Sequence, residues 1–269
     1  MSEPKPRRAH LVAGGFPPGA MGGHDHDYAR LKLLGLFAER DLPASVANDF
    51  ADVEKWLAVS RLLVSYVAGP YPDAAQTRAI AAWLDAGGHW LALHGSSGGR
   101  AERVEGQRMR RTIAGDHHAL LGGMFLTHPP IREFRVEVAD RSSPLTAGLP
   151  ASFTIEDEPY FVALHDPGAV QILLTADYGP AATNATGGLY PSDTSLLADG
   201  RHRAVGYTKP VGRGAVAYFA LGHCHNPAIR AARANADPAD TTPPLFRAPW
   251  ENAGFLALLR NGIGWGVGD

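Results

Sequence analysis

The 269-residue chain has one cysteine, Cys224, so no disulfide can form within it. It has no apolar run close to the roughly 20 residues that a membrane helix needs. A formal net charge of −2 gives no electrostatic attraction for nucleic acid or for an anionic membrane surface. Residues 1–8 are polar and basic and lack the apolar segment of a secretory signal. These absences predict a cytoplasmic protein with no nucleic-acid or membrane partner.

Nucleotide-binding motifs are also missing. Gly14-Gly15 is followed by Phe16-Pro17-Pro18, which is not the glycine-rich turn that binds a dinucleotide, and there is no phosphate loop. We therefore expect no nucleotide cofactor. The chain is instead rich in glycine, with 31 residues, and in histidine, with 12. The histidines matter for function only if the fold brings them together.

One stretch combines a buried strand with a polar end. Apolar residues fill His89–His94, and Gly95-Ser96-Ser97-Gly98-Gly99 follows at once. In open α/β sheets, ligands bind outside the carboxyl ends of the strands. His94 is therefore expected at a ligand-binding edge.

Strands and helices alternate over the first hundred residues. We predict a helix from the N-cap Asp27 to Arg40, and a second over Pro72–Ala86. The expected strands cover 9–15, 45–48, 61–66 and 89–94. This pattern indicates an α/β fold with a doubly wound, mostly parallel sheet flanked by helices, as in flavodoxin-like proteins.

The alternation ends after Gly99. We expect Arg100–Arg111 to form a surface helix, and Arg132–Val138 a half-exposed strand. A hairpin is expected over 204–221, and a closing helix from about Pro249. No repeat or linker divides the chain, so we predict a single domain over residues 1–269.

Histidines and acids recur at the ends of the expected strands. They are His24 and His26, His94, His128, Asp157 and Glu158, and His223 and His225. Such placement predicts one polar cleft supplied by several loops. Cys224, between two histidines, is expected to point into the core.

Six short segments occur in a recognisable order between about residues 9 and 265. They are Gly23 to Asp27, Leu93-His94-Gly95, His128-Pro129, Asp140 to Pro150, Asp157 to Tyr160, and Gly212 to His223. In this order they resemble the trehalose-utilisation (ThuA-like) family, which has the class I glutamine amidotransferase-like fold. The resemblance leaves His24-Asp25 and His26-Asp27 as alternatives for one motif, and we place His26 in the site. It implies a small-molecule carbohydrate substrate, a sugar oxidised to a keto form by a partner dehydrogenase.

The residues suit such a substrate. A keto group acidifies the neighbouring C–H bonds, so a base, an acid and an electrophile can drive lyase, hydrolase or isomerase chemistry. Histidine serves either proton role near neutral pH, and Tyr160 can donate to a sugar or enolate oxygen. Two or three histidines with Glu158 can hold a divalent metal such as zinc. The candidate catalytic residues are His94, Glu158, His223, His128, His26, Asp157 and Tyr160.

Two alternatives stay open. Gly95 to Gly99 fits the nucleophile motif of serine hydrolases, with Ser97 as nucleophile, and Asp157 or Glu158 and then His223 follow in the order that these enzymes use. A sugar-binding protein without catalysis is the other alternative. The absence of a cysteine from the turn after the strand argues against glutaminase chemistry.

Overall fold

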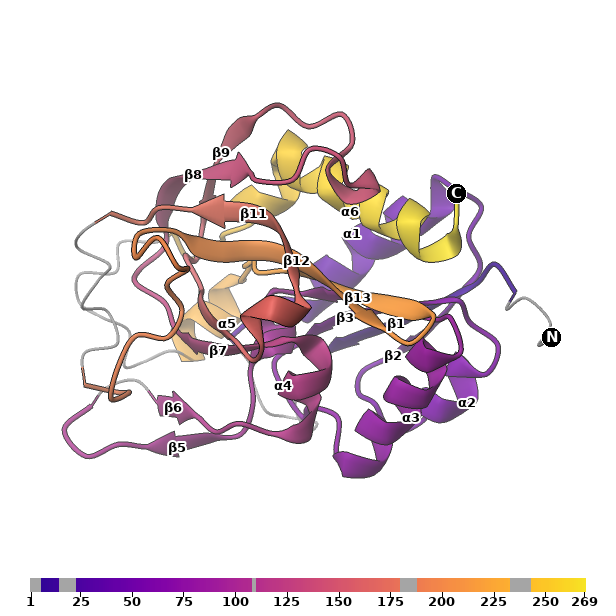
Figure 1. Ribbon diagram of the computed structural model, residues 1–269, viewed down its shortest axis with the longest axis horizontal. Coiled ribbons are helices and arrows are strands. Elements are labelled where there is room, and N and C mark those ends of the chain that lie inside the picture. Colours follow the sequence, from indigo (N-terminus) through magenta and orange to yellow (C-terminus); the bar gives the residue numbers. More distant parts are fainter. Residues whose placement is uncertain (1–5, 15–22, 108–109, 180–187, 233–242) are drawn as a thin grey trace.

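The computed structural model describes residues 6–14, 23–107, 110–179, 188–232 and 243–269; Gly15, expected to end the first strand, lies outside these ranges. Within them, a nine-stranded sheet has the order β2-β1-β3-β4-β13-β12-β11-β8-β9 (Figure 1). The parallel part consists of β2 (Ala44–Ala47), β1 (Ala9–Gly14), β3 (Leu62–Val67), β4 (His89–Leu93) and β13 (Gly214–Phe219). The antiparallel part adds β12 (Arg203–Val211), β11 (Gln171–Ala176), β8 (Arg132–Val138) and β9 (Ser152–Asp157). The predicted α/β class is confirmed, and the sheet is mixed.

Helices cover both faces of the parallel part. Leu62, Val64 and Tyr66 of β3 belong to the core cluster formed with α1 (His26–Ala38) and α6 (Ala253–Val267). Leu63 and Val67 belong to the opposite cluster, with α2 (Val53–Leu57) and α3 (Ala74–Asp85) (Figure 1). Alternate residues of a strand point to opposite faces, so a strand that is apolar throughout is buried on both sides. This is the doubly wound arrangement that the sequence predicts.

The starts of two helices follow from capping side chains. The Asp73 carboxylate accepts from the Gln76 amide at 2.8 Å, and the Gln76 side chain accepts from the Asp73 amide at 2.9 Å, so α3 begins with a capping box. The cap of α1 is Asp25, whose carboxylate accepts from the Tyr28 amide at 3.2 Å. The prediction of Asp27 as the cap is wrong because Asp27 already lies in the first helical turn.

The predicted helix over Arg100–Arg111 is also wrong. This segment contains a hairpin of β5 (Ala101–Arg103) and β6 (Arg110–Thr112), in which Glu102 lies opposite Arg111 and forms an ion pair with it. The segment has no apolar stripe that a helix could bury, so cross-strand pairing decides its structure.

The remaining elements complete the fold around the antiparallel part. After α4 (Asp116–Leu121), β7 (Gly123–Thr127) pairs antiparallel with β10 (Phe161–Leu164), and α5 (Pro227–Ala232) follows β13. No helix in the described ranges is both long and apolar enough to cross a membrane.

Buried histidines should make the fold sensitive to acid. Burial lowers the pKa of His10, His89 and His118 from the ordinary 6.5 to about 4. Below pH 6.5 the unfolded chain therefore binds protons that the folded chain does not bind until near pH 4. The free energy of unfolding should thus be greatest above pH 6.5 and fall as the pH is lowered toward 4.

Urea unfolding at intervals between pH 7.5 and 4.5 measures this effect. The variant H89Q should unfold with a shallower pH dependence than the original chain, because one of the three groups is removed. A pH dependence that is identical in the two proteins would contradict this explanation.

Candidate functional site

Three histidines follow parallel strands at the same edge of the sheet. His24 lies in the connection between β1 and α1, His94 directly follows β4, and His223 follows β13. The backbone of His94 has φ of 44°, an uncommon conformation for a residue with a side chain, and such strain is found mostly at functional sites. The histidines are thus brought to the edge at which open α/β sheets bind ligands.

Glu158, between β9 and β10, is the acidic centre of the site. One carboxylate oxygen, Oε2, lies 3.0 Å from His223 Nδ1 and 3.5 Å from His94 Nε2. The other, Oε1, lies 3.7 Å from His128 Nε2. Glu158, His94 and His223 are buried, whereas the His128 side chain is 21% exposed. His94, His128, Glu158 and His223, four of the residues expected in one polar cleft, therefore lie together. Beside them is a cavity of about 190 Å³ lined by Glu158, His128, His24 and Tyr160 among others.

His24, and not His26, belongs to this cluster. His24, His94, Glu158 and His223 each offer one ligand atom within 4.8 Å of the others. His26 is the first residue of α1, and its ring contacts the ring of His24 at a centroid distance of 5.9 Å. The expectation that His26 occupies the site is therefore corrected: the motif is His24-Asp25.

Asp25 fixes His24 in place. Its amide donates to the Cys224 carbonyl at 2.7 Å, and its carboxylate accepts from Tyr28 at 3.2 Å and from Arg247 at 3.1 Å. The bond to Cys224 joins the segment of His24 to that of His223. Cys224 itself is buried, as expected.

Asp157 supports the site through the backbone. Its carboxylate accepts from three amides: Glu158 at 2.8 Å, His223 at 3.0 Å and Gly222 at 2.7 Å. Burial raises the pKa of Asp157 well above its usual range, while these three amides act to lower it. Asp157 does not line the cavity, and its bonds to three amides position Glu158 and His223. The catalytic role expected for Asp157 stays a prediction.

Gly222 completes this support. Its φ is +114°, a conformation that favours glycine, and its carbonyl accepts from the Tyr66 hydroxyl and the Trp250 indole, both at 2.9 Å. With Asp157 on its amide, both polar groups of this residue are bonded. The direction in which the chain enters His223 is therefore fixed.

Hydrogen bonds determine which nitrogen of His94 faces Glu158. His94 Nδ1 lies 2.7 Å from the Ala220 carbonyl oxygen, which can only accept, so Nδ1 carries the proton. In the neutral ring, Nε2 then presents a lone pair to Glu158. His128 is arranged in the same way, with Nδ1 donating to the Pro129 carbonyl at 2.9 Å and Nε2 toward the carboxylate.

Two hydrogen bonds, through the rings of His223 and His225, determine which nitrogen of His223 carries the proton. His225 Nε2 donates to the Pro243 carbonyl at 2.8 Å, so the neutral His225 ring accepts at Nδ1. His223 Nε2 donates to that atom at 2.8 Å, and His223 Nδ1 presents its lone pair to Glu158. Lone pairs and a carboxylate thus face one another, and such a group of acceptors requires a cation, either a proton or a metal ion.

The charges fit this arrangement. Burial raises the pKa of Glu158, but the neighbouring His128 and His223 outweigh burial and hold it well below its usual range. Burial, together with His94 and His223, lowers the pKa of His24 well below its ordinary value. Glu158 is therefore held as a carboxylate and His24 as a neutral imidazole, the forms in which these groups bind metal ions.

Two hydroxyl groups differ in their access to the cluster. Tyr160 stacks on His94 at a centroid distance of 4.0 Å, and its hydroxyl lies 3.5 Å from His24 Nε2. Ser97 is buried, with its hydroxyl bonded to the Tyr218 hydroxyl at 2.7 Å and to the His94 carbonyl at 3.3 Å. Neither partner of Ser97 is a base that could activate it, so this geometry does not favour a serine hydrolase.

Sequence reasoning missed several supporting residues. Asp25 and Gly222 were seen as parts of motifs, but Tyr66 and Trp250 occur in segments that look like ordinary core. The signal for Asp25 and Asp157 was their place next to a proposed ligand, since outer residues commonly orient ligands. Nothing in the sequence marks Tyr66 or Trp250.

Solved structures place the chain in a known fold class. It is similar to a glutamine amidotransferase from Thermotoga maritima, with a TM-score of 0.52 and 11% identity over 98% of this chain and 99% of that chain. The class is therefore the glutamine amidotransferase-like α/β fold.

A family model described as trehalose utilisation (ThuA) matches residues 22–234, and the chain belongs to the ThuA family. Membership implies a role in carbohydrate metabolism. ThuA-like proteins from Bacteroides uniformis and Parabacteroides merdae are similar, at 17% and 18% identity, with TM-scores of 0.62 and 0.59. The similarity covers 99% and 98% of this chain, and 93% and 90% of theirs. No curated protein matches the chain.

The role of Asp157 can be measured. The substitution D157N keeps the shape of the side chain but turns one acceptor oxygen into a donor that faces a backbone amide. It should lower the free energy of unfolding by about 1–3 kcal/mol, the cost of leaving a buried polar group without its hydrogen bond, and weaken metal binding to the site. Urea unfolding and zinc titration test both effects.

The matched control is D166N, an exposed aspartate whose carboxylate also accepts from a backbone amide, that of Gly168 at 3.0 Å. It should leave zinc binding unchanged. Unaltered zinc affinity in D157N as well would show that Asp157 has no positioning role.

Proposed function

We propose that this protein is an enzyme that acts on a keto-sugar or keto-glycoside by proton transfer at the His–Glu site, with a divalent metal ion as cofactor. The observation that carries the proposal is the set of acceptors around Glu158. His94 Nε2 and His223 Nδ1 present lone pairs to the same carboxylate oxygen, at 3.5 and 3.0 Å.

The donor set fits a first-row divalent ion. Three imidazoles and one carboxylate, all buried, suit zinc, manganese or iron better than magnesium or calcium, which prefer oxygen ligands. His94 and His223 each donate their other N–H to a fixed acceptor, as metal-bound histidines almost always do. His24, His94, Glu158 and His223 would hold the ion, which would supply a Lewis acid for a carbonyl oxygen.

The chemistry of the substrate defines what the other residues must do. In a 3-keto-glycoside, the carbonyl at C3 acidifies the proton on C2. When a base removes this proton, its electron pair forms the C1–C2 double bond and breaks the C1–O bond. The departing oxygen keeps the bonding pair, takes a proton and leaves as an alcohol. Elimination and keto–enol isomerisation of such sugars both begin with the removal of the C2 proton, and net hydrolysis results when water adds to C1 of the elimination product.

His128 is suited to be the base. It lines the cavity, is partly exposed, and its Nδ1–H bond to Pro129 leaves Nε2 able to accept a proton. Tyr160 also lines the cavity, and its hydroxyl can donate to the enolate oxygen or another sugar oxygen. This assignment separates the metal ligands from the groups that move protons.

The carbonyl of the substrate must come from an oxidation elsewhere. No dinucleotide-binding motif occurs in the sequence, so we assign that step to a separate sugar dehydrogenase. A cytoplasmic location is proposed from the single cysteine, which fits a reducing compartment. The second candidate function is that of a protein that binds a sugar in the same cavity without converting it.

Metal binding is tested by removing and restoring the ion. Protein stripped with a chelator should gain thermal stability on addition of zinc or manganese, because an ion that binds only the folded state stabilises it. H24A should weaken this binding by at least about 100-fold, the upper end of what the loss of a residue behind a ligand costs. H26A, two residues further along the chain and outside the group of proposed ligands, serves as the control.

Equal metal binding in H24A and H26A would contradict the ligand assignment. A stripped protein that none of these ions stabilises would remove the metal from the proposal, while leaving the proton-transfer part to be judged by the next measurement.

Proton transfer is tested by isotope exchange. The protein should catalyse exchange of the C2 proton of a 3-keto-glucoside with deuterium from the solvent, followed by NMR. H128A should lower the rate by about 10²- to 10⁴-fold, the usual contribution of a general base. E158Q should lower it as well, and exposed H165A should not.

Binding of the keto-glucoside without exchange or product would favour the sugar-binding alternative. Full activity in both H128A and E158Q would show that the chemistry occurs elsewhere.

A further inference from the structure

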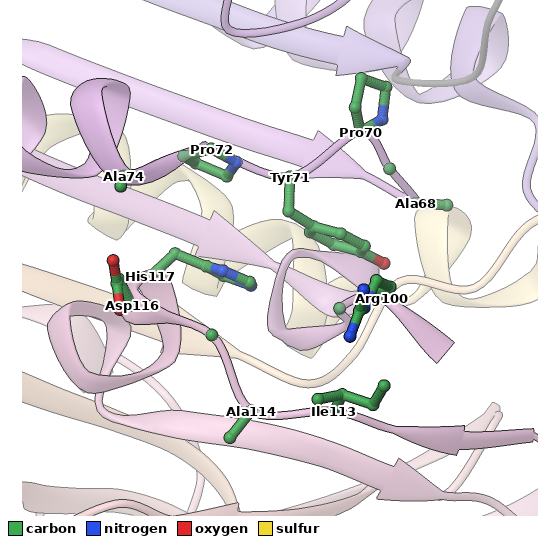
Figure 2. Close-up of a pocket in the computed structure, with 13 residues that line it drawn as sticks. Ala68, Pro70, Tyr71, Pro72, Ala74, Arg100, Ile113, Ala114, Asp116 and His117 are labelled. Atoms are coloured by element: carbon green, nitrogen blue, oxygen red, sulfur yellow. The ribbon is translucent and has the colours of Figure 1, made fainter. Parts of the chain in front are cut away.

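A second and larger cavity adjoins the cavity at the His–Glu cluster. Its volume is about 630 Å³, against about 190 Å³ for the smaller one. Its walls come from three segments: the connection between β3 and α3, the Gly99-Arg100 pair, and the residues that lead into α4 (Figure 2). None of the residues proposed above as metal ligands or proton-transfer groups lines this larger cavity.

Tyr71 connects the two cavities, because it lines both. Gly98 lines the smaller cavity and its neighbour Gly99 lines the larger one, so the chain itself passes from one to the other. A side chain at position 98 would collide with the Tyr71 hydroxyl, so this approach requires glycine there. The cavities are neighbouring parts of one binding region, divided at Tyr71.

The wall around this division is rigid. His117 Nε2 and His118 Nε2 both donate to the Gly98 carbonyl, at 2.8 and 2.9 Å, and His118 Nδ1 accepts from the Gly115 amide at 2.9 Å. The ring of His117 also stacks on that of Tyr71, with a centroid distance of 5.2 Å and an angle of 7°. Such a wall is formed before a ligand arrives, which lowers the entropic cost of binding.

The lining indicates the kind of group that fits. Pro70, Tyr71 and Ile113 offer apolar surface, while the exposed Arg100 and Asp116 add charge and hydrogen-bonding capacity (Figure 2). A flat or chair-shaped ring with one apolar face and polar edges matches this mixture. The volume also lies in the range of about 300–1,000 Å³ that is typical of small-molecule sites, whereas the smaller cavity accommodates a single sugar ring at most.

We propose that the larger cavity binds the ring of the leaving group, so that the substrate is a two-ring keto-glycoside and not a free keto-monosaccharide. This inference rests on the proposed function, in which the keto ring lies at the His–Glu cluster. The keto ring then occupies the smaller cavity, the linking oxygen passes Tyr71, and the second ring, an aryl group or a sugar, lies against Pro70 and Ile113. The larger cavity thereby sets the specificity for the leaving group.

Calorimetric titration with three ligands tests the inference: 3-keto-glucose, its 4-nitrophenyl glycoside, and a disaccharide that carries the keto group on one ring. The unmodified protein should bind at least one two-ring ligand ten-fold or more tightly than 3-keto-glucose. I113W and A74W fill the larger cavity and should reduce that preference at least ten-fold without changing the affinity for 3-keto-glucose. A75W, exposed on the same helix and adjacent in sequence, is the matched control.

The possible results separate this inference from the proposed function. If 3-keto-glucose binds and the second ring adds nothing, or if neither I113W nor A74W reduces the preference, the leaving-group site is wrong and the proposed function stands. If none of the three ligands binds, both are wrong. A preference that A75W reduces as much as I113W also overturns the inference.

Discussion

The site depends on one buried carboxyl group, that of Asp157, which accepts hydrogen bonds from backbone amides. Asp157 ends β9, at the edge of the antiparallel part of the sheet, yet it accepts from the amides of Gly222 and His223, which follow the parallel strand β13. It also accepts from the amide of Glu158. One side chain therefore sets the positions of the acid and of one histidine at the same time. Hydrogen bonds hold donor and acceptor within a narrow range of distances, so these amide bonds fix where Glu158 and His223 lie relative to each other.

The hydrogen bonds behind the histidines serve a different purpose, because they set proton positions. Carbonyl oxygens of Ala220 and Pro243 lie at the outer ends of the His94 bond and the His223–His225 relay. Carbonyls cannot donate, so each neutral ring turns its lone pair inward. Burial of several acceptors without a cation would be costly, and the low pKa of Glu158 keeps its negative charge in place. The fold thus buries Glu158, His94 and His223 side by side.

The sequence predicted the parts of this structure that depend on local patterns. Apolar strands that end in histidine indicated the parallel half of the sheet and placed His94, Glu158 and His223 at one site. The helix expected over Arg100–Arg111 does not form, because the segment has no apolar face to bury. The segment forms a hairpin instead, in which Glu102 pairs with Arg111 across the two strands. Long-range contacts were not predictable either. The choice of His24 over His26 depends on the bond from Asp25 to Cys224, 199 residues away in the chain.

The strained turn at His94 has a wider consequence. His94 has a positive φ in the connection that follows β4, and its ring faces Glu158. Related folds place a nucleophile on a comparable turn after a strand, whereas this chain has an imidazole there. The turn therefore fixes the position of the residue that follows β4, and this residue can be substituted without a change in the sheet. The chemical group at the end of β4 is thereby set by the identity of one residue, while its position is set by the strand and the turn.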